Sequence, residues 1–310
     1  MNICTITYKE CGNDLYSEEG LKLLSKDLEN LKLFPYTHSE QIREALTNVS
    51  NLNHPGTSQK LNANLNIKTE CFELTDTNSR FIIKPQNTLY TQIPENEDLT
   101  MRLAGAAGID VPLHGLIYCK DKSMSFFIKR FDRGPKKSKY YTEDFAQLSN
   151  KPRDEKYNSS MEEISGIIDK YCTFPVLEKI KLLRITIFNY LTGNSESHLK
   201  KYSVINKDDK IELSPFYDLV NTDIIYGEND IEIALPLNSK RKNLNYNDLI
   251  KYYAKNILVL NDKVILEFLK SFENAIPVWL ELIQKSFLKD ELKEKYFKHL
   301  EKKIVKFFKT

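Results

Sequence analysis

The period of the hydrophobic pattern changes along this chain, and this change limits its fold more than any other feature. Between residues 61 and 67, four apolar side chains alternate with three asparagines, so 60–74 is expected to be a half-buried strand. Further strands are expected at 2–8, 81–86, 109–119 and 123–133, and helices at 17–31, 37–49 and 95–108. From about residue 140 the period is helical, at 160–172, 174–193, 246–257, 261–272 and 288–309.

A strand-rich part followed by a helix-rich part predicts an α+β protein. We expect two lobes, a strand-rich N-terminal lobe at 1–133 and a C-terminal lobe dominated by helices at 134–310. The segment 132–145, which contains Gly, Pro and three lysines, is expected to be the linker. Its basic residues suit a solvated linker better than a contact with RNA or an acidic partner.

Composition excludes several classes of protein. The 310 residues include 45 Lys and Arg against 43 Asp and Glu, a net charge of +2. A dedicated nucleic-acid binder normally has a strong basic excess, so we expect no direct DNA binding. Hydrophobic residues make up 41%, which is enough for a sizeable core and argues against disorder. Ligands the size of a phosphate remain compatible with this balance.

The five cysteines, at positions 4, 11, 71, 119 and 172, are odd in number and form no C-x-x-C pair. This spacing argues against a disulfide framework or a zinc ribbon. The N-terminus lacks a basic region followed by a long apolar stretch, and no apolar run has the length of a membrane span. We therefore expect a cytoplasmic protein without membrane association, although secretion without a signal peptide stays open.

Two features of the first part suit phosphate binding. Backbone N–H groups of the segment Gly56–Lys60, "GTSQK", could cradle a phosphate, although an ordinary hairpin entrance fits it better when it is taken alone. Lys84 stands within the apolar strand "FIIKPQ", where a lysine either points to solvent or needs a counter-charge. In kinases such a strand lysine binds phosphate oxygens and is oriented by a glutamate from the next helix. Glu97 is the candidate, and Glu95 and Asp98 compete with it.

Three later segments follow, and the order of these candidate segments along the chain resembles the order of the functional segments in kinases. The strand "FFIKRFDR", with Lys129 and Phe131, leads into the linker. The loop "GNSESHLKK", residues 193–201, follows an apolar helix and crowds a His, a Glu and two Lys into one turn. Asp218 follows a strand and a proline, a place where a carboxylate suits Mg²⁺ held by oxygen ligands and phosphates. Each segment alone also fits a strand end, a solvated corner or a helix cap.

Taken together, these residues resemble the HipA family of kinase-like toxins, and specifically its short HipT-like form. The resemblance covers most of the chain and includes "GTSQKLNANLN", "FIIKPQ", "PENEDLTMRLAGAAGIDVPLHGLIYC", "FNYLTGNSESHLKKYSVI" and "LSPFYDLVNT". It implies a two-lobed protein Ser/Thr kinase with ATP between the lobes, Mg²⁺, and a hydroxyl acceptor on another protein. It also implies a toxin–antitoxin operon, a separate small protein that supplies a missing N-terminal subdomain, and a DNA-binding antitoxin. Known family targets are aminoacyl-tRNA synthetases.

The resemblance assigns roles to individual positions. Gly56 and Lys60 match the phosphate loop, and Lys84 matches the ATP lysine. Lys129 and Phe131 match the hinge, mainly through their backbone, and Asp218 matches the metal-binding aspartate. The family's phosphate loop often carries serines just before the glycine that are autophosphorylated to switch the kinase off. Asn53 and Pro55 occupy those places, and we do not assume that Thr57 or Ser58 substitutes for them.

The catalytic loop departs from the family pattern G-N-x-D-x-H-x-K-N. Glu196 stands at the catalytic aspartate and Lys201 at the metal-binding asparagine, whereas His198 and Lys200 are kept. A glutamate can accept a proton, but its extra methylene shifts the carboxylate by roughly an ångström, which can cost about 10²-fold in rate. A lysine ammonium has no acceptor and cannot ligate Mg²⁺, but it could neutralise a phosphate directly.

Three hypotheses follow. An active, slow HipT-like protein kinase is supported by Lys60, Lys84, Asp218 and the acid at 196. A pseudokinase that binds a nucleotide or a partner is supported by the joint loss of Asp and Asn from the loop. A small-molecule phosphotransferase on the same fold is disfavoured, because the resemblance extends through the C-terminal lobe.

Overall fold

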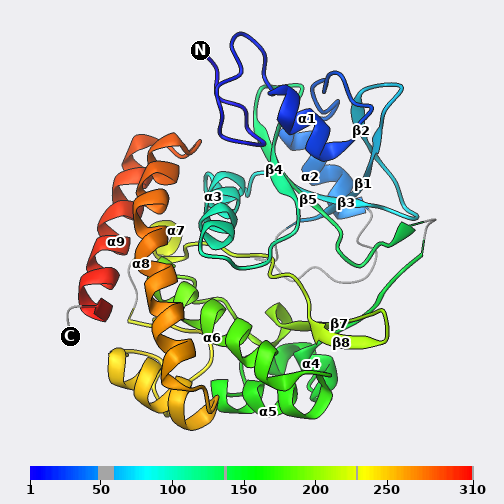
Figure 1. Ribbon diagram of the computed structural model, residues 1–310. Coiled ribbons are helices and arrows are strands. Elements are labelled where there is room, and N and C mark those ends of the chain that lie inside the picture. Colours follow the sequence, from blue (N-terminus) through cyan, green and yellow to red (C-terminus); the bar gives the residue numbers. More distant parts are fainter. Residues whose placement is uncertain (48–58, 136–137, 228–229, 309–310) are drawn as a thin grey trace. The chain divides into compact units, whose positions relative to one another are not determined.

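The computed structural model describes residues 1–47, 59–135, 138–227 and 230–308 (Figure 1). They form two compact units. The first unit contains 1–99, 112–133 and 285–288, and the second unit contains 100–111, 134–284 and 289–310. The predicted domains 1–133 and 134–310 stay a prediction, because units defined by contacts are not thereby independent folding domains.

A five-stranded antiparallel sheet forms the centre of the first unit, with the strand order β2-β1-β3-β5-β4 (Figure 1). Its strands are β1 Leu61–Asn66, β2 Cys71–Leu74, β3 Phe81–Lys84, β4 His114–Tyr118 and β5 Met124–Lys129. Apolar side chains of β1, β2, β3 and β5 gather in one buried cluster that includes Ala63, Phe72, Ile83 and Phe127. The alternation expected at 61–67 thus gives β1 a buried face, as period-2 patterns do in half-buried strands.

Two expected strands differ from those observed. The single strand expected at 60–74 is two strands, because the Asn66 side chain accepts a hydrogen bond from the Lys68 N–H (3.0 Å) and starts a turn. The strand expected at 2–8 is a series of turns. The Tyr8 N–H donates to the Cys4 carbonyl (2.9 Å) and the Cys4 N–H donates to the Lys9 carbonyl (2.8 Å), so this segment bonds to itself.

The helices α1 (Glu18–Leu24), α2 (His38–Thr47) and α3 (Ile93–Ala106) lie in the expected places, although α1 is shorter than expected. Ser17 caps α1 by accepting from the Gly20 N–H (3.1 Å). At the start of α2, Thr37 accepts from the Glu40 N–H (3.2 Å), and Glu40 accepts from the Thr37 N–H (2.7 Å). This reciprocal pattern is a capping box with Thr37 as the cap.

The second unit combines a three-stranded sheet with most of the helices. The sheet has the order β6-β7-β8, with β6 Tyr141–Asp144, β7 Ser203–Lys207 and β8 Lys210–Leu213. The helices are α4 Phe145–Leu148, α5 Met161–Tyr171, α6 Pro175–Thr192, α7 Asp223–Tyr226, a π-helix at Asn247–Ile257, α8 Asp262–Lys285 and α9 Asp290–Phe308, with 3-10 turns at Arg153–Glu155 and Leu199–Lys201. β6 corrects the expected linker at 132–145, because Tyr141–Asp144 pairs with β7 along its whole length.

Helix α6 is the central helix of the second unit and packs against α5 and α9. From Leu182 to Thr192 nearly all of its side chains are buried. The fully buried Trp279 of α8 packs edge-on against Phe188 of α6 (5.8 Å between ring centroids), and its indole N–H donates to the Leu103 carbonyl (2.8 Å). These contacts fix the C-terminal end of α6, from which the predicted catalytic loop leaves.

The predicted α+β class is confirmed by this mixture of an antiparallel sheet and a helical unit. Among the described residues, no helix is both long enough and apolar enough to cross a membrane.

Candidate active site

Lys84 and Glu97 form a buried ion pair in the first unit, where 4% and 3% of their side chains are exposed. Lys84 ends β3 and Glu97 lies in the first turns of α3. The ammonium also lies 5.4 Å from the centroid of the Phe126 ring, the neighbour of Lys84 on β5. Removing two charges from water is costly, and it is offset only when each charge has its partner in place.

The two competing acids have other partners. Gln86 donates its amide to both carboxylate oxygens of Glu95 (2.8 and 2.9 Å), and the Tyr8 hydroxyl donates to Asp98 (2.8 Å). Burial raises the pKa of Glu95 to about 7, while the hydrogen bonds from Gln86 act in the opposite direction. Glu97 is therefore the acid that pairs with Lys84, as the sequence predicted. That this pair binds ATP stays a prediction.

The second unit holds the loop at 193–201, which begins at Gly193. Gly193 follows α6 in the left-handed conformation, with a φ of 69°. A Cβ atom there would lie 2.7 Å from two ring atoms of His299. His299 is itself buried, and its Nδ1 lies 3.2 Å from a carboxylate oxygen of Asp223. A glycine is required here both by the backbone conformation and by the close approach of the imidazole.

The next two residues of the loop attach it to its surroundings. The Asn194 amide donates to the side-chain oxygen of Asn189 on α6 (3.0 Å). Ser195 forms two hydrogen bonds with the Thr222 hydroxyl, one through its N–H (3.2 Å) and one through its own hydroxyl (2.8 Å). The Thr222 hydroxyl in turn donates to the Gly193 carbonyl (2.7 Å). The loop is thus bonded on one side to α6 and on the other to the segment that follows Asp218.

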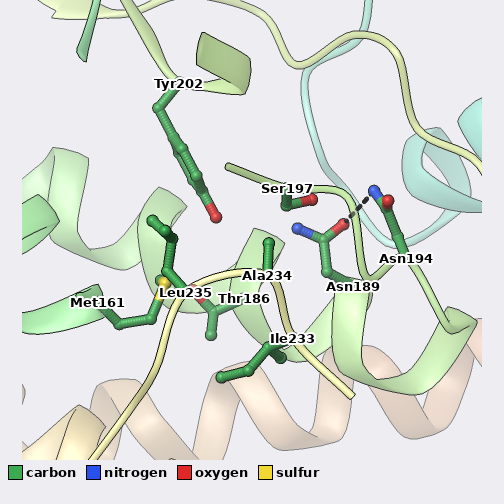
Figure 2. Close-up of a pocket in the computed structure, with 9 residues that line it drawn as sticks. All are labelled: Met161, Thr186, Asn189, Asn194, Ser197, Tyr202, Ile233, Ala234 and Leu235. Atoms are coloured by element: carbon green, nitrogen blue, oxygen red, sulfur yellow. Dashed lines mark hydrogen bonds between the residues drawn. The ribbon is translucent and has the colours of Figure 1, made fainter. Parts of the chain in front are cut away.

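A small cavity of about 10 Å³ lies beneath the loop, and Figure 2 shows polar ends of several residues directed into it. It is lined by Met161, Thr186, Asn189, Asn194, Ser197, Tyr202, Ile233, Ala234 and Leu235. This volume has room for about one water molecule. The cavity is too small for a substrate, so we regard it as part of the support of the loop.

The carboxylate of Glu196 accepts a hydrogen bond from the Tyr157 hydroxyl. The Tyr157 ring meets the ring of His198 edge-on (5.1 Å, 84°), and the ammonium of Lys156 lies 5.0 Å from the Tyr157 centroid. Burial, followed by the hydrogen bond to Glu196, raises the pKa of Tyr157 well above its usual value, so its hydroxyl keeps its proton and remains a donor. Sequence reasoning missed Tyr157, because it lies in a loop without periodicity.

His198 is 5% exposed, and its Nδ1 has no hydrogen-bond partner in the part of the chain that the structure describes. Burial, together with the charges of Lys201 and Lys156, lowers the pKa of His198 to about 3. The imidazole is therefore neutral near pH 7 and packs against Tyr157. Its predicted catalytic role stays a prediction.

The two lysines of the loop each pair with a different aspartate. Lys200 lies 2.7 Å from Asp144, which also caps α4. Lys201 lies 2.6 Å from Asp218, with 24% and 12% of the two side chains exposed. Asp218 has a left-handed backbone with a φ of 56°, a conformation that aspartate adopts more easily than most residues. The loop and its partners thus bring together Glu196, His198, Lys200 and Asp218.

The resemblance implies a Mg²⁺ ion beside Asp218. Mg²⁺ takes an octahedron of oxygen ligands, commonly one or two carboxylates together with phosphates and water. At this site Asp218 offers a carboxylate that is already bonded to an ammonium, and Lys201 offers no lone pair. In the described ranges, no three His, Cys, Asp or Glu side chains form a group that could hold a metal ion. Residues 201 and 218 therefore do not fit an ion held by two protein ligands.

The remaining predicted positions are less informative. Gly56, Thr57 and Ser58 lie outside the described residues. Lys60 is exposed directly before β1, and Lys129 is exposed at the end of β5, where its N–H donates to the Leu113 carbonyl (2.8 Å). Phe131 is half-buried two residues further on. The phosphate-loop and hinge roles stay predictions.

The mixed fold and the buried pair of a strand lysine with a helix glutamate are features that this protein shares with kinase-like proteins. The family of the HipA-like C-terminal domain matches residues 52–279, and the chain belongs to that family.

Comparison with known proteins gives the same result. The chain is 30% identical over 257 residues to a Haemophilus influenzae protein whose name marks it as an inferred kinase, covering 76% of this chain and 74% of that protein. It is 27% identical over 206 residues to the serine/threonine-protein kinase toxin HipA of Shewanella oneidensis, covering 60% of this chain and 46% of the toxin.

The fold matches a solved structure. HipA of Shewanella oneidensis MR-1, in a toxin–antitoxin complex with HipB and operator DNA, has a TM-score of 0.72 at 22% identity, covering 91% of this chain and 73% of that chain. At this identity the likeness shows the fold, and it confirms the predicted HipA-like architecture.

Proposed function

We propose that this chain is an ATP-dependent serine/threonine protein kinase of the HipT-like form, acting as the toxin of a toxin–antitoxin system. It transfers the γ-phosphoryl group of ATP to a hydroxyl of another protein, with an aminoacyl-tRNA synthetase as the candidate target. The observation that carries this proposal is the buried ion pair of Lys84 and Glu97. Kinases use a strand lysine held by a helix glutamate to bind nucleotide phosphates. Burying two charges costs desolvation free energy, so a functional role is the better explanation of this pair.

In this proposal Glu196 accepts the proton of the attacking hydroxyl, and Tyr157 holds its carboxylate in place. The support is the hydrogen bond from the Tyr157 hydroxyl to Glu196, which fixes the longer side chain in one direction. Lys200 is held by Asp144 at the edge of the same loop, where its charge attracts phosphate. The rate is expected to be low, because the glutamate displaces the base from the position that an aspartate would give it.

A pseudokinase is the second candidate, and one observation favours it. The pairing of Lys201 with Asp218 occupies the carboxylate that a kinase uses for its metal ion. In this alternative the chain binds a nucleotide or a partner protein without phosphoryl transfer.

For partners, we propose a DNA-binding antitoxin and a small protein that supplies an N-terminal subdomain. The support is the resemblance, together with the solved complex of HipA, HipB and operator DNA. Isolation of the complex from its native cells would test this proposal, since two small co-purifying proteins are expected.

The two candidate functions are separated by incubating the purified protein with labelled ATP and Mg²⁺, with and without bacterial lysate. The kinase proposal expects slow labelling of a protein band, which Lys84→Met abolishes. The kinase proposal fails if the wild type binds ATP without labelling any protein, while the double variant Glu196→Asp/Lys201→Asn transfers phosphate to a protein. That second result would establish a pseudokinase whose loop alone prevents catalysis.

A further inference from the structure

The three charged residues of the loop have separate partners. Tyr157 donates to Glu196, Lys200 pairs with Asp144 and Lys201 pairs with Asp218. Lys201 is the last residue of a 3-10 turn, and its N–H donates to the His198 carbonyl (2.8 Å), so its backbone is fixed. The fixed backbone of this turn therefore holds the Lys201 side chain beside Asp218.

An ammonium at this position does part of what a divalent cation does. It neutralises Asp218 at 2.6 Å, and it keeps further N–H donors that can bond to phosphate oxygens. Charge-assisted bonds from lysine to phosphate are strong, particularly where the partners are partly withdrawn from water. With 24% of its side chain exposed, Lys201 can be reached by a ligand and is also partly shielded from solvent.

Further cations lie near this pair. Lys156 interacts electrostatically with Lys200, Lys201 and Arg153, while Glu196 is the nearby carboxylate that opposes them. Asp144 and Asp218 pair with two of these cations, so cations and carboxylates are nearly balanced around the pair. The charge that would meet a polyphosphate in place of a metal ion is therefore the ammonium of Lys201 itself.

We propose that Lys201 takes the place of the divalent cation beside Asp218, so that this site binds a nucleoside triphosphate without requiring Mg²⁺. The inference rests on the proposed function, since it assumes that the protein takes a nucleotide. It deepens that function by naming the form of the ligand, which is the metal-free triphosphate. An asparagine at 201 would instead return an oxygen ligand to the site and restore the need for a metal ion.

Equilibrium binding of ATP to the full chain, measured by calorimetry in excess Mg²⁺ and again in excess EDTA, tests the proposal. The wild-type Kd is expected to agree within about 3-fold between the two conditions. For Lys201→Asn, the Kd in EDTA is expected to exceed the Kd in Mg²⁺ by about tenfold or more. Lys210→Met, at an exposed position that starts β8, removes one charge outside the loop and is expected to keep the wild-type ratio.

Three results would overturn the proposal. A wild-type affinity that falls tenfold in EDTA would show that the metal is required. A Lys201→Asn protein that binds equally well in both conditions would remove the role from Lys201, and circular dichroism would confirm that this variant is folded. A wild-type protein that binds no ATP in either condition would overturn the proposed function together with this inference, so the two failures are distinct.

Discussion

The ammonium of Lys84 and the carboxylate of Glu97 form an ion pair between β3 and α3 that is almost completely withdrawn from solvent. Removing one member of a buried ion pair takes from the other charge the opposite charge beside it, which typically costs 3–5 kcal/mol. We therefore expect Lys84→Met to lower the free energy of unfolding by about 3–5 kcal/mol and to abolish ATP binding. Urea unfolding and calorimetry would measure the two effects.

The double variant Lys84→Met/Glu97→Leu is the matched control for this prediction. It removes both charges, so it should recover most of the stability while ATP binding stays lost. A single variant that costs less than about 1 kcal/mol would contradict the view that this pair is a tightly coupled buried unit.

The Tyr157–Glu196 hydrogen bond gives a kinetic prediction. Glu196→Gln should reduce phosphoryl transfer by about 10²–10⁴-fold, because an amide cannot accept the proton. Tyr157→Phe should reduce it by about tenfold at an unchanged KM for ATP, because the carboxylate remains but loses its orientation. Single-turnover assays would measure both effects, with Tyr141→Phe, at an exposed position, as control. Full activity in Glu196→Gln would remove the base role from Glu196.

Gly193 gives a prediction about stability. Gly193→Ala should lower the free energy of unfolding for two reasons. An alanine in the left-handed conformation costs about 1–2 kcal/mol, and displacing the His299 ring costs about 1–3 kcal/mol more. Gly166 in α5 is the matched control, because a Cβ there meets nothing within 4 Å. Gly166→Ala should stabilise the protein by about 0.5–1 kcal/mol. Equal effects of the two substitutions on the unfolding midpoint would show that the surroundings of Gly193 are less rigid than the structure indicates.

Glu95 gives a prediction about pH. Its pKa is raised from 4.5 to about 7, so the folded protein binds this proton more tightly than the unfolded chain does. The resulting stabilisation is fully present below about pH 4.5 and is lost as the pH rises through about 7, a difference on the order of 3 kcal/mol. Unfolding measured from pH 4.5 to 8 should therefore show a weaker decline in Glu95→Gln than in the wild type. An identical decline would indicate that Glu95 is ionised throughout this range.

Local patterns explain what could be predicted from the sequence. The pairing of Lys84 with Glu97 was predictable from the kinase pattern, in which a strand lysine is oriented by a glutamate of the next helix. The helices that begin next to Ser17 and Thr37 were predictable from their local sequence at 17–31 and 37–49. By contrast, the strand expected at 2–8 was wrong, because β-branched residues favour extended backbone yet the hydrogen bonds of Cys4 and Tyr8 close a turn.

The contacts that the sequence did not predict join segments with no common period. Tyr157 reaches Glu196 across 39 residues from a loop, and His299 reaches Gly193 from the last helix. The Lys201–Asp218 pair spans the hairpin of β7 and β8, whose two ends return to the same place. That pair is the exception, because the hairpin itself brings the two residues together, whereas the approach of Lys156 to Lys201 depends on tertiary packing.

The small segment 285–288 has a consequence for the synthesis of the protein. It belongs to the first unit, where Phe287 packs edge-on against Tyr8 (5.4 Å) and its carbonyl accepts from the Gln92 amide (3.2 Å). On a translating ribosome these contacts cannot form when residue 133 has been made, and must wait on the order of ten seconds or more for residue 288. A nascent chain therefore carries an incomplete first unit until it is nearly finished, and a fragment that stops at residue 133 would retain that defect permanently.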